Sequence, residues 1–234
     1  VVVWGTNRFG LVNGTTSVST CIGVAAGDWH VLALRANGTV AAWGDNSAGQ
    51  LSVPAGLVGV VRVAAGGQRS AALLSDGRLV SWGGGPVTTN LPAPGSDYVQ
   101  FVAAGWRTMS LRSDSSVDVA GWNGYGEGFA PGTVTGLVAV AAGEVHGYVL
   151  DAAGRVTGWG PNPRGAVTLP PLTNASRVAA GAFHGAAVAD GVVRVWGDNS
   201  FGQTNVPANS TGVVALACAA EGVVAAEADG DVLA

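Results

Sequence analysis

The sequence has no lysine and few charged residues of either sign. All eleven basic residues of the 234-residue chain are arginines, and charged residues make up 11% of it, against about 25% in an average soluble domain. The net charge is −4. Nucleic-acid binding needs a basic stripe, so this composition argues against such a partner. No run of 18 apolar residues occurs, so no membrane span is expected.

Most of the chain consists of a repeat of about 39 residues, and residues 24–54 are its clearest copy. An Ala-Ala-Gly segment begins at Ala25, Ala64, Ala103, Ala141 and Ala179, and residues 217–219 form a degraded sixth copy. The tryptophan copies are Trp4, Trp43, Trp82, Trp122, Trp159 and Trp196. These tryptophans are expected to pack one repeat on the next.

Within residues 24–54 the pattern predicts short strands. An alternating run spans 30–34, Asn37-Gly38 is a hairpin turn, and a second run ends at Trp43-Gly44. Several short strands in each repeat of this length are typical of a propeller. We predict an all-β fold, with residues 1–234 as a single β-propeller of six four-stranded blades. The repeats begin near residues 21, 60, 99, 138, 176 and 213, and residues 1–20 complete the last blade, which Val1–Gly5 would close.

The segments AAGDWHVLAL, WGDNSAGQLSVP and WGDNSFGQTNVP resemble the repeat of the regulator of chromosome condensation superfamily. They are most similar to its compact bacterial branch, which includes a secreted beta-lactamase inhibitory protein of the second type. The resemblance implies a propeller of four-stranded blades and a protein that binds proteins rather than catalysing a reaction. The chain departs from these relatives in having six repeats where they have seven blades. It also lacks the inserted wedge of the exchange-factor branch, which makes nucleotide exchange the least favoured function.

The repeats vary most in the loop after Trp-Gly and in the three residues after Ala-Ala-Gly. Constant strands with variable loops are typical of a scaffold that presents a binding face. The resemblance to the inhibitory branch implies that aromatic residues after Ala-Ala-Gly line the contact surface. The predicted partner-binding residues are Trp29, Trp106, Phe183, Arg69, Arg107, Asp28 and Glu144, with Glu221 in the degraded repeat. The alternative for the three aromatic residues is local packing over the blade.

No constellation of catalytic or metal-ligating residues stands out. His30, His146 and His184 share one repeat position and so belong to different blades, which argues against a common metal ion. The acidic residues in 227–231 are expected to form the Asp-Gly hairpin turn of the repeat rather than a calcium loop. We therefore predict no enzyme activity, no metal and no cofactor.

Four glycosylation sequons begin at Asn13, Asn37, Asn174 and Asn209, all in predicted turns or links. They favour a secreted or cell-surface domain, although Asn-Gly is also ordinary turn chemistry. The two cysteines, Cys21 and Cys218, are five repeat positions apart. That offset is too long for a disulfide between equivalent strands, so two free thiols are favoured over a mutual bridge.

The sequence favours a non-enzymatic protein-interaction scaffold, extracellular or on the cell surface and belonging to a larger protein or assembly. Two alternatives stay open. One is a secreted inhibitor of a beta-lactamase-type enzyme, and the other is a propeller enzyme that acts on glycans.

Overall fold

The structure is a computed structural model that describes residues 8–11, 20–84, 97–121, 134–208 and 210–233. In these ranges the regular structure is β-strand, apart from two single 3-10 turns at Arg8–Gly10 and Pro163–Gly165. The predicted all-β class is confirmed. Among the described residues no helix is long and apolar enough to cross a membrane.

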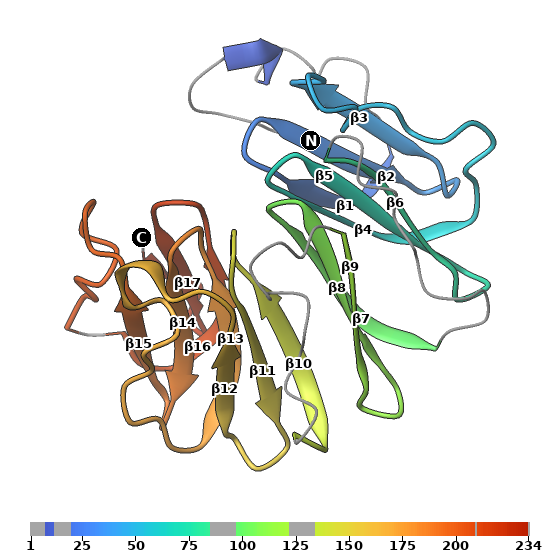
Figure 1. Cartoon of the computed structure of the whole chain (residues 1–234). Coiled ribbons are helices and arrows are strands. Elements are labelled where there is room, and N and C mark those ends of the chain that lie inside the picture. The colour runs from blue at the N-terminus through green and yellow to red at the C-terminus, as the bar shows by residue number, and fades with distance from the viewer. Residues whose placement is uncertain (1–7, 12–19, 85–96, 122–133, 209, 234) are drawn as a thin grey trace. The chain divides into compact units, whose positions relative to one another are not determined.

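The described strands form six antiparallel sheets, each made of three consecutive strands (Figure 1). The first three sheets are β1 (Cys21–Ala26), β2 (His30–Arg35) and β3 (Val40–Gly44); β4 (Val60–Gly66), β5 (Arg69–Leu74) and β6 (Leu79–Gly83); and β7 (Tyr98–Ala104), β8 (Arg107–Arg112) and β9 (Val117–Gly121). The other three are β10 (Leu137–Ala142), β11 (Gly147–Asp151) and β12 (Val156–Trp159); β13 (Ala175–Ala180), β14 (His184–Ala189) and β15 (Val192–Gly197); and β16 (Val213–Cys218), β17 (Val223–Glu227) and β18 (Val232–Leu233).

The prediction of four-stranded blades is wrong for the links that the structure describes. Residues 51–59 form no strand, and after β15 the expected fourth strand is reduced to one bridge between Val192 and Thr211. Pro54 and Pro207 lie in these links. Proline has no N–H to donate to a ladder, which explains why the links do not extend the sheets.

The chain divides into two compact units, and each is described by itself. One holds residues 1–112 with 120–122, and the other holds 113–119 with 123–234. The prediction of one propeller domain over 1–234, with Val1–Gly5 closing the last blade, stays a prediction because residues 1–7 lie outside the described ranges.

The middle strand of each complete sheet is the core of that sheet. All of β5 and β14 is buried, as are the first five residues of β2. Small residues such as Ala33 and Ala187 make room for a tryptophan ring, since Ala33 packs with Trp43 and Ala187 with Trp196. The predicted core role of the repeated tryptophans is therefore confirmed for Trp43, Trp82, Trp159 and Trp196, which are 5–9% exposed.

Three of these indoles, those of Trp43, Trp82 and Trp196, each donate a hydrogen bond to the repeat before them. Trp82 Nε1 donates to the Gln50 carbonyl over 2.9 Å, and Trp196 Nε1 donates to the Ala166 carbonyl over 2.8 Å. Trp43 Nε1 donates to the Leu11 carbonyl over 2.9 Å. The tryptophan therefore joins neighbouring repeats by both packing and hydrogen bonding.

The third repeat departs from the predicted tryptophan spacing. In the first, second, fourth and fifth sheets, the third strand ends with a tryptophan followed by a glycine of positive φ, such as Gly44 with φ 111°. In the third sheet this glycine is Gly121, with φ 119°, and the residue before it is Ala120. Placing Trp122 at the same position as Trp43 is therefore wrong by two residues, and Trp122 itself lies outside the described ranges. Trp4 also lies outside them.

Antiparallel order gives every sheet two distinct ends. We call the end formed by the β1–β2 connection and the residues after β3, with their equivalents in the other sheets, the loop end. The backbone confirms this grouping, because Asp45 N donates to the Trp29 carbonyl over 2.7 Å and Asp198 N to the Phe183 carbonyl over 3.0 Å. The opposite end, which holds the β2–β3 hairpin at Asn37-Gly38, is the turn end.

Candidate functional site at the loop end

A buried histidine or arginine begins the second strand, or directly precedes it, in five of the six repeats. Strand register places four of these residues at equivalent positions. Arg69 and Arg107 pair with the last residue of the first strand of their sheets. His30 and His184 directly precede the residue that makes this pair. His146 precedes β11 at the same point. All five side chains are at most 1% exposed. This column is therefore a structural feature of the repeat.

The histidines explain the glycine of the Ala-Ala-Gly segment. A Cβ at Gly27 would lie 2.3 Å from His30 Cε1, and one at Gly181 would lie 2.1 Å from His184 Cε1. Burial lowers the pKa of His30 to about 4 and also lowers the pKa of His184. His30 Nε2 lies 3.0 Å from Ser70 Oγ, so the neutral ring is held by the next repeat.

This burial corrects part of the predicted contact surface. Arg69 and Arg107, expected to meet a partner, are 0% and 1% exposed. Burial lowers the pKa of Arg69. A guanidinium group that no solvent reaches cannot supply donors to an incoming protein, so these two residues do not form part of an exposed face.

The residue just before this column is exposed. It is Trp29 in the first repeat and Trp106 in the third, with exposed fractions of 37% and 48%. Trp106 directly precedes Arg107, as Trp29 precedes His30, so strand register gives the two tryptophans equivalent places. Both therefore lie at the loop end, and their role in partner binding stays a prediction.

The loop after Trp-Gly is closed by its own side chains. In residues 45–50, Gln50 Nε2 donates to Asp45 Oδ2 over 3.0 Å, and Ala48 N donates to Gln50 Oε1 over 2.9 Å. In residues 198–203 the same bond joins Phe201 N to Gln203 Oε1 over 2.9 Å. The Ser200 hydroxyl, with Arg164 nearby, lowers the pKa of Asp198 to about 2. The motif therefore makes a firm loop that presents one variable residue.

That variable residue adds aromatic groups to the loop end. Phe201 is 65% exposed and Phe9 is 48% exposed. The ring of Phe9 meets Trp29 edge-on, with centroids 6.0 Å apart. The loop after Ala-Ala-Gly and the loop after Trp-Gly meet at the same end of a sheet because its strands are antiparallel, and this signal is present in the strand order of the sequence.

Phe183 is less available than the two tryptophans. The Arg164 guanidinium lies over its ring, 5.2 Å from the centroid. Arg164 Nη1 in turn donates to Asp198 Oδ2 over 2.6 Å. Phe183 is half-buried beneath this ion pair, which supports the packing alternative for this residue more than a contact role.

The acidic residues predicted for the contact surface do lie at the loop end. Asp28 and Glu221 are exposed, and Glu144 is partly exposed. Partial burial raises the pKa of the Asp28 carboxyl, and a hydrogen bond from the Gly67 backbone opposes that shift. Arg69 and Arg107 are internal, whereas Arg8 directly precedes Phe9 in the sequence, so the loop-end residues still carry charges of both signs.

Two of the four sequons lie at the turn end, opposite the aromatic residues of their own sheets. Asn37 is exposed in the β2–β3 turn, where its Oδ1 accepts from Thr39 N over 3.1 Å. Asn174 is exposed and its Nδ2 donates to Asp190 Oδ1 over 2.7 Å. Asn13 and Asn209 lie outside the described ranges. Glycosylation at all four sites stays a prediction.

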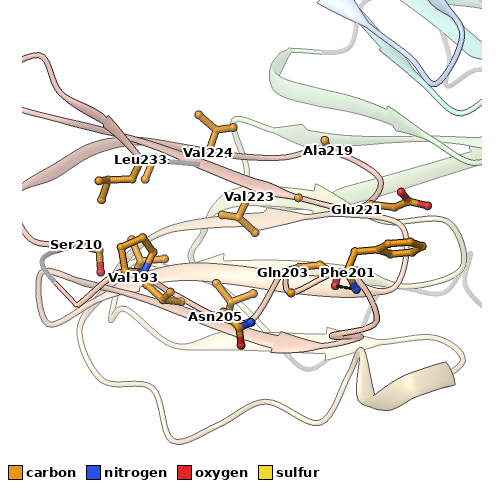
Figure 2. Close-up of a pocket in the computed structure, with 16 residues that line it drawn as sticks. Val193, Phe201, Gln203, Asn205, Ser210, Ala219, Glu221, Val223, Val224 and Leu233 are labelled. Carbon is orange, nitrogen blue, oxygen red and sulfur yellow. Dashed lines mark hydrogen bonds between the residues drawn. The ribbon is translucent and has the colours of Figure 1, made fainter. Parts of the chain in front are cut away.

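A cavity of about 330 Å³ opens in the second unit between β15 and β17 (Figure 2). Its walls include Val193, Val195, Gln203, Val223 and Leu233, and Phe201 and Glu221 stand at its loop end. The lining is mainly apolar and contains no pair of groups arranged for acid–base chemistry.

The acidic hairpin of the last repeat has the expected turn structure. Gly230 N donates to the Glu227 carbonyl over 3.1 Å, and Asp231 N donates to Asp229 Oδ1 over 3.1 Å. The carboxylates of Glu227, Asp229 and Asp231 come within 4.8 Å of one another. Cys21 and Cys218 form no disulfide with each other in the structure.

Comparison with known proteins gives a family match to part of the chain. The regulator of chromosome condensation (RCC1) repeat matches residues 21–50 and 60–86. The chain resembles the structure of Prp20p from Saccharomyces cerevisiae, described with its binding to Gsp1p and histones, at 18% identity and a TM-score of 0.74. That alignment covers 91% of this chain and 70% of Prp20p. No curated protein sequence matches the chain.

Other solved structures show the same likeness. Human WBSCR16 aligns at 20% identity and a TM-score of 0.69, over 88% of this chain and 72% of that one. The ectodomain of the Arabidopsis thaliana receptor kinase ACR4 aligns at 20% identity and a TM-score of 0.70, over 89% and 82%. These similarities show an RCC1-like propeller fold. The closer resemblance to the bacterial inhibitory branch stays a prediction.

Proposed function

We propose that this chain is a non-enzymatic protein-interaction module that binds its partner at the loop end. The observation that carries the proposal is the exposed aromatic pair Phe9–Trp29, in which Trp29 lies on a loop whose backbone is fixed by hydrogen bonds. Prp20p, with the same fold, is described with its binding to other proteins. Protein binding is therefore a use that this fold supports.

The loop end has the physical properties of a contact surface. Tryptophan and phenylalanine offer large apolar areas with few rotatable bonds, so little conformational entropy is lost when they are covered. One loop of this end, residues 45–50, is held in a single shape by the hydrogen bond between the Asp45 and Gln50 side chains. Preorganisation of this kind lowers the cost of association.

The charge at the loop end indicates what the partner offers. Asp28, Glu144 and Glu221 supply carboxylates, whereas Arg69 and Arg107 are buried and Arg164 is paired with Asp198. A partner that offers an apolar pocket for the Phe9–Trp29 pair, with a basic group for Asp28, fits this arrangement. Opposed charges of this kind fix orientation and speed association more than they strengthen binding.

The proposal is tested with a partner captured from the natural source and then measured as a purified pair. Trp29→Ala and Phe9→Ala should each weaken binding by about 2 kcal/mol, roughly thirtyfold in Kd, if these rings are anchors. Ile22→Ala is the matched control, because Ile22 is 67% exposed but lies at the turn end of β1. Equal affinity of all three variants and the parent would refute the proposal.

Three finer assignments are part of the same proposal. The six sheets are the blades of one ring, with Val1–Gly5 contributing to its closure. The domain belongs to an extracellular or cell-surface protein, which the exposed Asn37 and Asn174 sequons support. Intact mass of protein from its natural source tests this location, since unmodified asparagines would remove its main support. A beta-lactamase-type target would use the same loop end, and inhibition assays with Trp29→Ala separate that partner from others.

A further inference from the structure

Arg69 carries a buried guanidinium group that no described residue neutralises. Its side chain is 0% exposed, and Nε, Nη1 and Nη2 have no hydrogen-bond partner within the described ranges. Arginine keeps its charge at any ordinary pH, and an isolated buried charge is costly unless it is paired. Burial lowers the pKa of Arg69, and no carboxylate opposes that shift. A negative charge is therefore needed at this point of the second sheet.

Two other repeats place a carboxylate beside the equivalent residue. In the first sheet His30 pairs with Gly44, and Asp45 follows that glycine. In the fifth sheet Asp198 has the same place beside His184. Burial lowers the pKa of both histidines, and the negative charge of the aspartate is one of the effects that oppose this shift. The residue after the paired glycine is therefore the one that brings negative charge to the buried column.

In the second sheet a glycine occupies that place. Arg69 pairs with Gly83, and Gly84 follows where the first and fifth repeats have aspartate. A Cβ built at Gly84 would lie 3.6 Å from Arg69 Cζ, and its three nearest atoms all belong to this side chain. A group of methyl size therefore fits there in ordinary contact with the guanidinium. The sequence from 85 to 96, which lies outside the described ranges, contains no acidic residue.

We infer that Arg69 and Gly84 form a binding site for a small carboxylate anion, of the size of acetate, taken up from solution. The anion takes the place that the aspartate side chain has in the first and fifth repeats, and accepts charge-assisted hydrogen bonds from the guanidinium. A protein side chain cannot reach a group that is 0% exposed, so the occupant is a small ion that enters through local opening. The site is independent of the partner that binds the loop end.

The site lies beside the contact between the first two repeats. Ser70, the next residue on β5, donates to the Gln50 carbonyl over 2.8 Å, and its Oγ lies 3.0 Å from His30 Nε2. Trp82 Nε1 donates to the same carbonyl. An anion that binds only the folded chain stabilises it by mass action. Occupancy of the site should therefore raise the stability of these two repeats.

The first experiment compares denaturant unfolding of the full chain in sodium acetate and in sodium chloride at equal ionic strength. Replacing about 100 mM chloride by acetate should lower the unfolding equilibrium constant about tenfold, as expected for a site with a Kd of about 10 mM. Arg69→His, which introduces the residue of three other repeats, should abolish this response. Arg62→His is the matched control, because Arg62 is an exposed arginine of the neighbouring strand β4, and it should respond like the parent.

Equal stabilisation by acetate and chloride would overturn the carboxylate as the ligand. A response to acetate that survives Arg69→His would overturn the site itself. The comparison does not rest on this variant alone, because a second variant supplies the missing carboxylate from the chain.

Gly84→Asp restores the residue that the first and fifth repeats have at this position. Its matched control is Gly56→Asp, because the two glycines have nearly the same φ, 76° and 75°, and a Cβ at Gly56 meets nothing within 4 Å. In chloride, the unfolding equilibrium constant of Gly84→Asp should be at least about tenfold lower than that of Gly56→Asp, as a hydrogen bond to a charged group provides. Gly84→Asp should also lose the response to acetate. Equal stability of the two aspartate variants, or an acetate response that persists in Gly84→Asp, would overturn the inference.

Discussion

Replacing Trp82 tests how neighbouring repeats are held together. Its indole is 7% exposed and belongs to a buried cluster with Leu32, Leu34 and Ala72. Burial of a tryptophan removes about 150–250 Å² from water, which corresponds to roughly 4–6 kcal/mol at about 25 cal/mol per Å². Partial relaxation around the cavity brings the expected loss for Trp82→Ala to about 3–5 kcal/mol.

Trp82→Phe separates packing from hydrogen bonding. The phenyl ring keeps most of the volume but cannot donate to the Gln50 carbonyl. That oxygen still accepts from Ser70 Oγ over 2.8 Å, so it is not left without a partner. The expected loss is therefore about 1–2 kcal/mol, made up of the lost indole bond and the smaller ring.

The assay is denaturant unfolding followed by circular dichroism, with the free energy of unfolding compared among the variants. Trp29→Ala is the control, because Trp29 is partly exposed and its Phe9 contact is worth about 1 kcal/mol. If Trp82→Ala costs no more than Trp29→Ala, or if Trp82→Phe costs as much as Trp82→Ala, the tryptophan does not join the repeats as described.

Two further predictions concern the buried histidines. Gly181→Ala should destabilise the fold by about 2 kcal/mol or more, since the new Cβ would lie 2.1 Å from His184 Cε1. Gly222→Ala, where a Cβ meets nothing within 4 Å, should be near neutral in the same thermal unfolding assay. The pKa of His30 is lowered by burial to about 4, from an ordinary value of 6.5, so the unfolded chain binds the proton more readily. Stability should be complete above pH 6.5 and fall by up to about 3 kcal/mol as the pH drops from 6.5 to 4. His30→Gln should flatten that part of the curve in denaturant titrations, and an unchanged slope would contradict the assignment.

The sequence predicted the repeat and the strand class because both follow from local patterns. Asn37-Gly38 fixed a hairpin turn, and the spacing of Trp43, Trp82, Trp159 and Trp196 matched their shared core position. The prediction of a fourth strand was wrong because Pro54 and Pro207, in the links after the third strand, have no N–H to donate to a ladder. Trp122 was placed two residues away from the position of Trp43. The left-handed backbone of Gly121, which matches Gly44, shows the true alignment, and the sequence does not reveal it.

The candidate site was predicted in part. The exposed places of Trp29 and Trp106 follow from alternation, because each precedes the buried column. Arg69 and Arg107 were misassigned since arginine is ordinarily a surface residue, and only the strand register shows that they replace a buried histidine. Phe9 and Phe201 were not placed at the same end as Trp29 because the shared loop end depends on antiparallel order, not on sequence proximity.

The most direct test of the loop end as the contact surface is a hydrogen-exchange footprint of the chain with its bound partner. We predict that binding protects amides around Trp29 and Trp106 and in the loop 45–50. Amides of the turn end, such as those at Asn37 and Gly38, should exchange as in the free protein. Protection confined to the turn end, with the tryptophan loops unchanged, would contradict the proposal.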